Sequence, residues 1–67
     1  MKKLTTMNEV WSEDNIGKTL FVDGNPWGEI TDRRLKFGAH TIHLVIDAMR
    51  YFCVDEEKLY RMELSVK

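Results

Sequence analysis

A single cysteine is the feature that most constrains how this chain can fold. Cys53 is the only cysteine among 67 residues, so no disulfide can form within the chain. Domains of this size bury only about 60% of their unfolded surface, and many depend on disulfides, a metal or self-association. His40 and His43 are the only other soft ligands, which is too few for a four-ligand zinc site. We therefore expect a compact apolar core without metal or cofactor, and a second copy of the chain is a candidate partner.

The composition is that of a globular protein without a targeting or membrane segment. Hydrophobic residues make up 43% of the chain, which argues against intrinsic disorder. Ten basic and eleven acidic residues give a net charge of -1, so the chain as a whole does not attract nucleic acid. A signal peptide would have an apolar segment after its basic start, but polar residues follow Lys2 and Lys3 here. No apolar run approaches the roughly 20 residues that a membrane span requires. Together with the lone thiol, these features predict a cytoplasmic protein.

Alternating residues predict a β-hairpin in the first half of the chain. Leu20 and Val22 share one face of a strand, and Phe21 takes the other. A dense turn signal, Asp-Gly-Asn-Pro, follows at 23–26. A second strand then resumes at 27–31, which completes the hairpin pattern.

The middle of the chain contains a polar interruption and then the clearest strand. Polar residues at 32–34 indicate a break or a β-bulge, after which 35–37 extend the strand and 38–39 form a turn. The strand at 41–46 is rich in β-branched residues, which favours β-structure. Its alternation directs three aliphatic side chains to one face and His43 to the other.

The last third of the chain predicts a strand, a turn and a closing strand. Residues 47–49 form a turn, and 50–54 return as a strand. Asp55 is a good N-cap for a single helical turn that follows it. Apolar and polar residues alternate again at 61–66, which predicts a closing strand with one wet face. An alternative interpretation makes 48–63 one helix, because its apolar residues also recur at roughly helical spacing.

Short helical signals precede the first strand. Thr6 and Glu9 have the spacing of a capping box, which predicts the start of a short helix. Ser12 and the acidic residues after it predict the start of a second helical turn. We expect one domain, 1–67, with a lead-in at 1–14 and the β-structure at 15–67. The residues predicted to form its core are Leu20, Val22, Ile30, Ile42, Leu44, Ile46, Met62 and Leu64.

The order of these signals resembles a small SH3-like β-barrel of about five strands. Residues 15–22 read NIGKTLFV and resemble the first strand of such domains. Residues 24–32, GNPWGEITD, resemble the glycine-containing turn and strand of PRC-barrel domains, and 50–57, RYFCVDEE, resemble their strand into a short turn. The resemblance implies a mainly β fold, to which the capping signals add a short N-terminal helical segment; the alternative is an α+β fold with one helix at 48–63. Barrels of these types are mostly adaptors for protein or RNA, although a fold does not fix a function.

Candidate catalytic groups have plain structural interpretations. Cys53 would be activated if His43 lay across from it on a neighbouring strand, but its flanking residues favour a core cysteine. His40 and His43 would point to opposite sides of a strand, so they would not share a metal. Asp47 with the acids at 55–57 would need a cleft to act as an acid/base pair, and a solvated turn is the simpler explanation. We therefore expect no enzyme.

The only basic cluster provides an alternative function. Arg33, Arg34 and Lys36, with His40 nearby, could follow a nucleic-acid backbone while Phe37 and Trp27 stack on bases. Acidic residues adjoin the cluster, so a solvated hairpin end is the plainer interpretation.

Seven aromatic residues are more than a core of this size easily encloses. Tryptophan and tyrosine dominate binding hot spots. Phe21 faces away from the predicted core, and Trp27 follows a proline turn. At least one of these two rings is predicted to be exposed, with Trp11 and Tyr51 as further members of a protein-binding surface. The chain is thus expected to be a non-catalytic module that docks on a larger protein through an aromatic patch or a sheet edge, of a size that phage and prophage genomes often encode.

Overall fold

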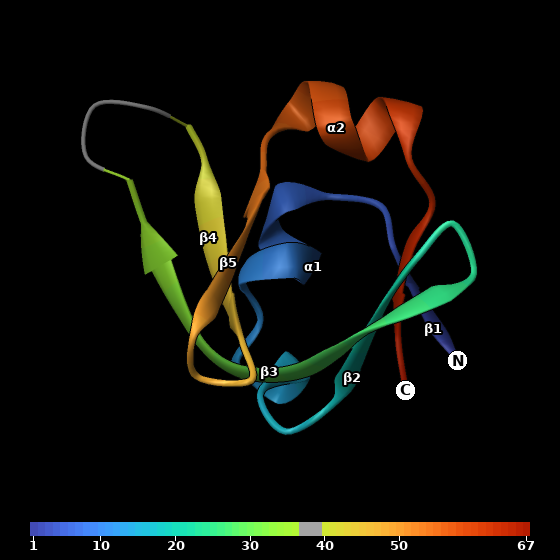
Figure 1. Ribbon diagram of the computed structural model, residues 1–67. Coiled ribbons are helices and arrows are strands. Elements are labelled where there is room, and N and C mark those ends of the chain that lie inside the picture. Colours follow the sequence, from blue (N-terminus) through green and yellow to red (C-terminus); the bar gives the residue numbers. More distant parts are fainter. Residues whose placement is uncertain (37–39) are drawn as a thin grey trace.

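A computed structural model describes residues 1–36 and 40–67, and in it six antiparallel strands form one sheet (Figure 1). The predicted turn at 38–39 and the ring of Phe37 lie outside the described residues. The sheet order is β1-β6-β2-β3-β4-β5. The elements are β1 Lys2–Leu4, α1 Met7–Trp11, the 3-10 helix η1 Glu13–Asn15, β2 Thr19–Val22, β3 Asn25–Leu35, β4 Ile42–Ile46, β5 Arg50–Val54, α2 Glu56–Arg61 and β6 Leu64–Val66.

The mainly β fold predicted from the sequence is confirmed, with one strand more than expected. The additional strand is β1, which pairs with β6 at the opposite end of the chain. The alternative helix at 48–63 is wrong, because β5 occupies the first part of this segment and only α2 is helical. The predicted closing strand at 61–66 is also too long, since α2 continues to Arg61 and β6 begins at Leu64.

The long strand β3 gives the sheet its curvature. Its first half pairs with β2 and its second half with β4. The register shifts near Phe21 and between Ile30 and Asp32, and bulges of this kind bend strands. The second shift adjoins the polar segment where a break or bulge was predicted. Figure 1 shows the result: the sheet curls around α1, and α2 lies over the open end.

The core lies on the concave side of the sheet. All the predicted core residues are buried there except Met62, which is half-buried because it caps α2 instead of lying in a strand. Two buried residues come from the predicted lead-in, Leu4 in β1 and Val10 in α1. Asn15 is also buried, and its Nδ2 donates to the carbonyl oxygens of Glu9 at 2.7 Å and Val10 at 3.1 Å. The N-terminal segment is therefore part of the packed structure.

The short helices begin where the sequence predicts. The Thr6 hydroxyl accepts from the Glu9 amide at 3.1 Å, and the Glu9 carboxylate accepts from the Thr6 amide, so the predicted capping box is confirmed. Ser12 caps η1, and Asp55 caps α2 by accepting from the Lys58 amide at 2.8 Å. No helix in the described part of the chain has the length and apolar character that crossing a membrane requires.

Candidate functional site

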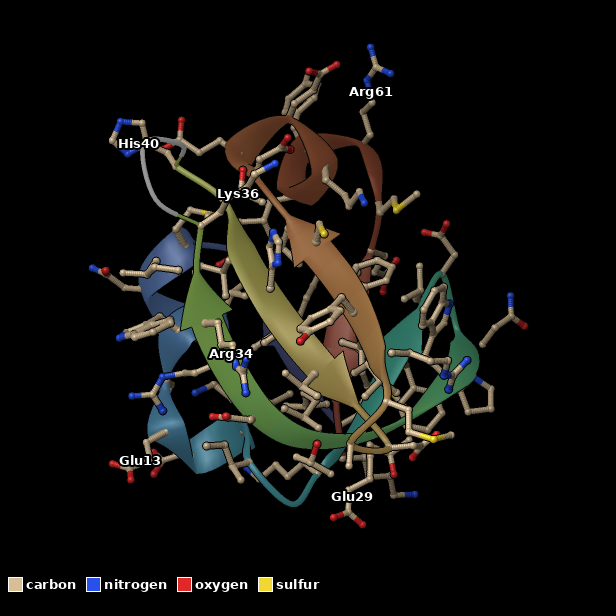
Figure 2. The ribbon with its side chains drawn as sticks, turned by 60° about the vertical axis from the view of Figure 1, so that its left-hand side comes forward. Glu13, Glu29, Arg34, Lys36, His40 and Arg61 are labelled. Carbon is tan, nitrogen blue, oxygen red and sulfur yellow. The ribbon has the colours of Figure 1, made fainter. Side chains whose placement is uncertain are left out.

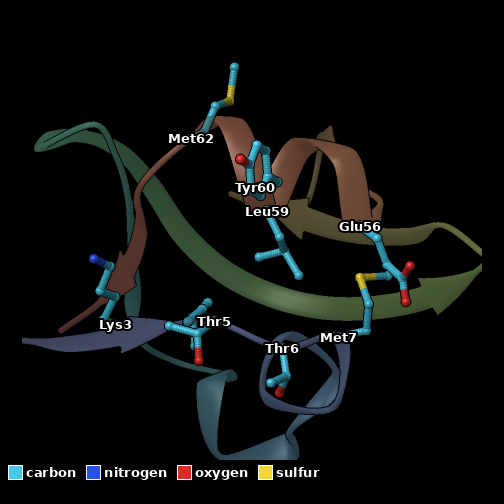
Figure 3. A pocket seen from close by; sticks show the side chains of 9 residues that line it. Lys3, Thr5, Thr6, Met7, Glu56, Leu59, Tyr60 and Met62 are labelled. Carbon is cyan, nitrogen blue, oxygen red and sulfur yellow. The ribbon is translucent and has the colours of Figure 1, made fainter.

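A groove runs between the N-terminal segment and α2 at the open end of the sheet (Figure 3). Its volume is about 540 Å³. This is within the size range of sites that hold small molecules or a few side chains of a partner. We call it the α2 groove, and its lining residues are Lys3, Leu4, Thr5, Thr6, Met7, Glu56, Leu59, Tyr60 and Met62.

The interior of the α2 groove is apolar and adaptable. Met7, Leu59 and Met62 are partly buried against the core, and Figure 3 shows Leu59 projecting from α2 toward the N-terminal segment. Methionine side chains have several rotatable bonds and fit partners of different shapes. Tyr60, on the same helix, is 92% exposed. The groove therefore combines a hydrophobic floor with a large exposed ring at its rim.

Two further hollows adjoin the α2 groove. One, of about 280 Å³, shares Met7 and Glu56 with it and is lined by Met7, Asn8, Trp11, Leu35, His40, Ile42 and Glu56. The other is lined by His40, Thr41, Asp55, Glu56 and Glu57. Glu56 lines all three hollows. No ion pair of Glu56 occurs among residues 1–36 and 40–67.

The sequence did not single out most of the residues of this groove. Met62 falls within the predicted closing strand at 61–66, and Met7 within the predicted lead-in at 1–14. The available signal is the three-residue spacing of Leu59 and Met62, which places two apolar side chains on the same side of a helical turn after Asp55. The groove itself depends on β1 lying near α2, which local patterns do not reveal.

The structure does not gather the four predicted interface aromatics into one patch. Trp27 packs edge-on against buried Phe52, with ring centroids 4.7 Å apart, and is 37% exposed. Phe21 is half-buried on the face of β2 opposite the core, and Tyr51 is exposed on the outer face of β5. Trp11 lines the hollow next to the α2 groove.

Hydrogen bonds hold the turn of the β4–β5 hairpin against β3 beside Trp27. Asp47 Oδ1 accepts from the Glu29 amide at 3.0 Å, and Asp47 Oδ2 lies 3.0 Å from Arg50 Nη2. Arg50 also donates to the Trp27 carbonyl oxygen, and its guanidinium lies 5.3 Å from the centroid of the Trp27 ring. The hydrogen bond from Glu29, followed by the one from Arg50, lowers the pKa of Asp47 below its ordinary value. Asp47 and Asp55 stand at opposite ends of β5, so the alternative of an acid/base pair between Asp47 and the acids at 55–57 has no support in the structure.

This lowered pKa predicts a pH-dependent contribution of Asp47 to stability. The charged form is favoured in the folded state, so its contribution is complete above about 3.8, the ordinary pKa, and is lost as the pH falls below that value. We expect Asp47→Asn to lower the thermal midpoint at neutral pH and the two proteins to converge in acid. Thermal unfolding at a series of pH values measures this. An offset that stays constant at every pH would show that the charge of Asp47 does not contribute.

The basic cluster is divided between the two faces of β3. Arg33 pairs in register with core residue Leu44, and its guanidinium lies 4.4 Å from the centroid of the Trp11 ring. Arg34 pairs with His43 and lies on the outer face, where its Nε is 3.7 Å from a carboxylate oxygen of Asp32 (Figure 2). Lys36 is exposed just beyond the end of β3, and His40 is exposed beside the second hollow. The cluster therefore does not form one continuous basic surface.

Cys53 is not in the core, contrary to the structural interpretation of its flanking residues. It is half-buried on the outer face of β5 and pairs in register with His43 on β4. Among the described residues, no hydrogen bond joins these two side chains. The rings of His43 and Tyr51 meet in an edge-on arrangement, with centroids 5.7 Å apart. Groups of three or more potential metal ligands are not found among the described residues.

Comparison with protein families, curated proteins and solved structures gives no match to this chain.

Proposed function

We propose that this chain is a non-catalytic protein-binding module and that an apolar segment of a partner docks in the α2 groove. The observation that carries the proposal is the groove itself, a concave surface with a flexible apolar floor and the exposed ring of Tyr60 at its rim. Large exposed aromatic side chains next to apolar hollows are typical of binding hot spots.

The topology supports an SH3-like architecture as part of this proposal. Strands β2, β3, β4 and β5 follow one another as antiparallel neighbours, and β6 returns to pair with β2 after the short helix α2. The long strand β3 is shared between the two halves, as in a small barrel. Small barrels of this type are mostly adaptors, which agrees with a binding role in the cytoplasm for a small module, such as one encoded by a phage.

A comparison of two exposed tyrosines tests the proposal. Linear peptides are first selected from a displayed random library on the wild-type chain. Tyr60→Ala should then weaken binding of a selected peptide by about 2 kcal/mol, the usual cost of truncating a hot-spot ring. Its thermal midpoint should change little, because the ring is almost fully exposed. Isothermal titration and thermal unfolding provide the two measurements.

Tyr51→Ala is the matched control, because this ring is 51% exposed on the outer face of β5, away from the groove. Loss of binding in Tyr51→Ala with full binding in Tyr60→Ala would move the interface to the outer face and contradict the groove. The nucleic-acid alternative would instead appear as salt-dependent binding to a short single strand that falls in an Arg34→Ala, Lys36→Ala variant. No arrangement of the described basic residues favours it.

A further inference from the structure

We infer that the segment bound in the α2 groove carries a basic side chain, lysine or arginine, that pairs with Glu56. The inference rests on the proposed function and adds the chemistry that selects the partner. It follows from the position of one carboxylate among the apolar side chains.

Glu56 occupies the junction of the hollows at the open end of the sheet. It is the first residue of α2, it is exposed, and it lines the α2 groove and both adjoining hollows. Figure 3 shows its side chain beside Met7, at the end of the groove away from Lys3. A segment that fills the groove toward this end would therefore place a side chain next to the carboxylate.

The neighbouring acidic groups are already engaged, whereas Glu56 is free. The Asp55 carboxylate accepts the Lys58 amide, and Glu57 Oε1 lies 2.9 Å from Arg61 Nη2. Within residues 1–36 and 40–67, Glu56 has no cation within ion-pair distance, and its carboxylate accepts no hydrogen bond. Lys58, two residues after Glu56, places its Nζ 4.7 Å from the centroid of the Phe52 ring instead.

A free carboxylate at the edge of an apolar groove discriminates between partners by charge. When a partner covers the groove, the surrounding water is displaced and the attraction between opposite charges strengthens. An uncompensated carboxylate would then be costly, and an acidic residue beside it more so. The apolar floor provides attraction for many segments, and Glu56 selects those with a basic side chain at the matching position.

Repeating the peptide selection on charge variants tests this inference. Peptides selected on the wild-type chain should combine apolar residues with lysine or arginine. Binding of such a peptide should fall about tenfold in Glu56→Gln and further in Glu56→Lys, as expected for loss and reversal of a close charge pair. A new selection on Glu56→Lys should enrich peptides with aspartate or glutamate. Glu57→Gln is the matched control and should change affinity less than about twofold, because its charge is paired with Arg61.

The outcomes separate the inference from the proposal on which it rests. Peptides that require Tyr60 but bind Glu56→Gln as tightly as the wild type would overturn the charge pairing and leave the groove as the docking site. Failure to select any peptide that requires Tyr60 would overturn both. Circular dichroism of each variant establishes that it is folded, and Glu56→Gln nearly preserves the size of the side chain.

Discussion

Replacing Gly28 with alanine is expected to destabilise the fold by about 3 kcal/mol or more. Gly28 has a φ of 145°, a backbone conformation that other residues rarely adopt, and strain of this kind costs about 1–3 kcal/mol. An added Cβ would also lie 2.4 Å from Asp47 Oδ2 and 2.7 Å from Ile46 Cγ2. Overpacking of this kind adds about 1–3 kcal/mol. Urea-induced unfolding monitored by tryptophan fluorescence measures the loss.

Gly24→Ala is the control for this substitution. Gly24 also has a positive φ, 83°, but no atom lies within 4 Å of a Cβ built there. Its replacement should therefore cost only the backbone strain. Equal stability of the two variants would mean that the Asp47 carboxylate can move away from the added Cβ at no cost in stability. Its hydrogen bonds to Glu29 and Arg50 would then contribute little to the fold.

Leu44→Ala is expected to cost about 2–5 kcal/mol of unfolding free energy, as for other fully buried leucines. Leu44 is fully buried in β4 and pairs in register with Phe52 on β5. A domain of this size has a total stability of only several kcal/mol. The variant should therefore be partly unfolded at moderate temperature, which chemical denaturation would show.

Leu35→Ala provides the comparison, because the Leu35 side chain is 64% exposed at the end of β3. Its replacement should change the unfolding free energy by less than about 0.5 kcal/mol. A loss of similar size at Leu35 and Leu44 would contradict the exposed position of Leu35 at the end of β3.

The strands with alternating residues could be predicted, the closing strand among them, whereas β1 and its long-range pairing with β6 could not. Alternation identified β2, β4 and β5, because each has one buried face and a turn beside it. The strand β1 has only Leu4 as an inward apolar residue, and its partner β6 lies at the other end of the chain. The same limitation applies to the candidate site. Exposed aromatics were expected, but Tyr60 became important only through the proximity of α2 to the N-terminal segment.

The position of β6 between β1 and β2 also constrains the order in which the protein can fold. The β2–β5 meander consists of neighbours in sequence, so its strands can pair across short connections. The strand β1, in contrast, pairs with β6 near the other end of the sheet-forming sequence. Such non-local pairing slows folding and leaves strand edges exposed in partly folded chains. The α2 groove, which needs β1 in place, is therefore among the last features of the molecule to be completed.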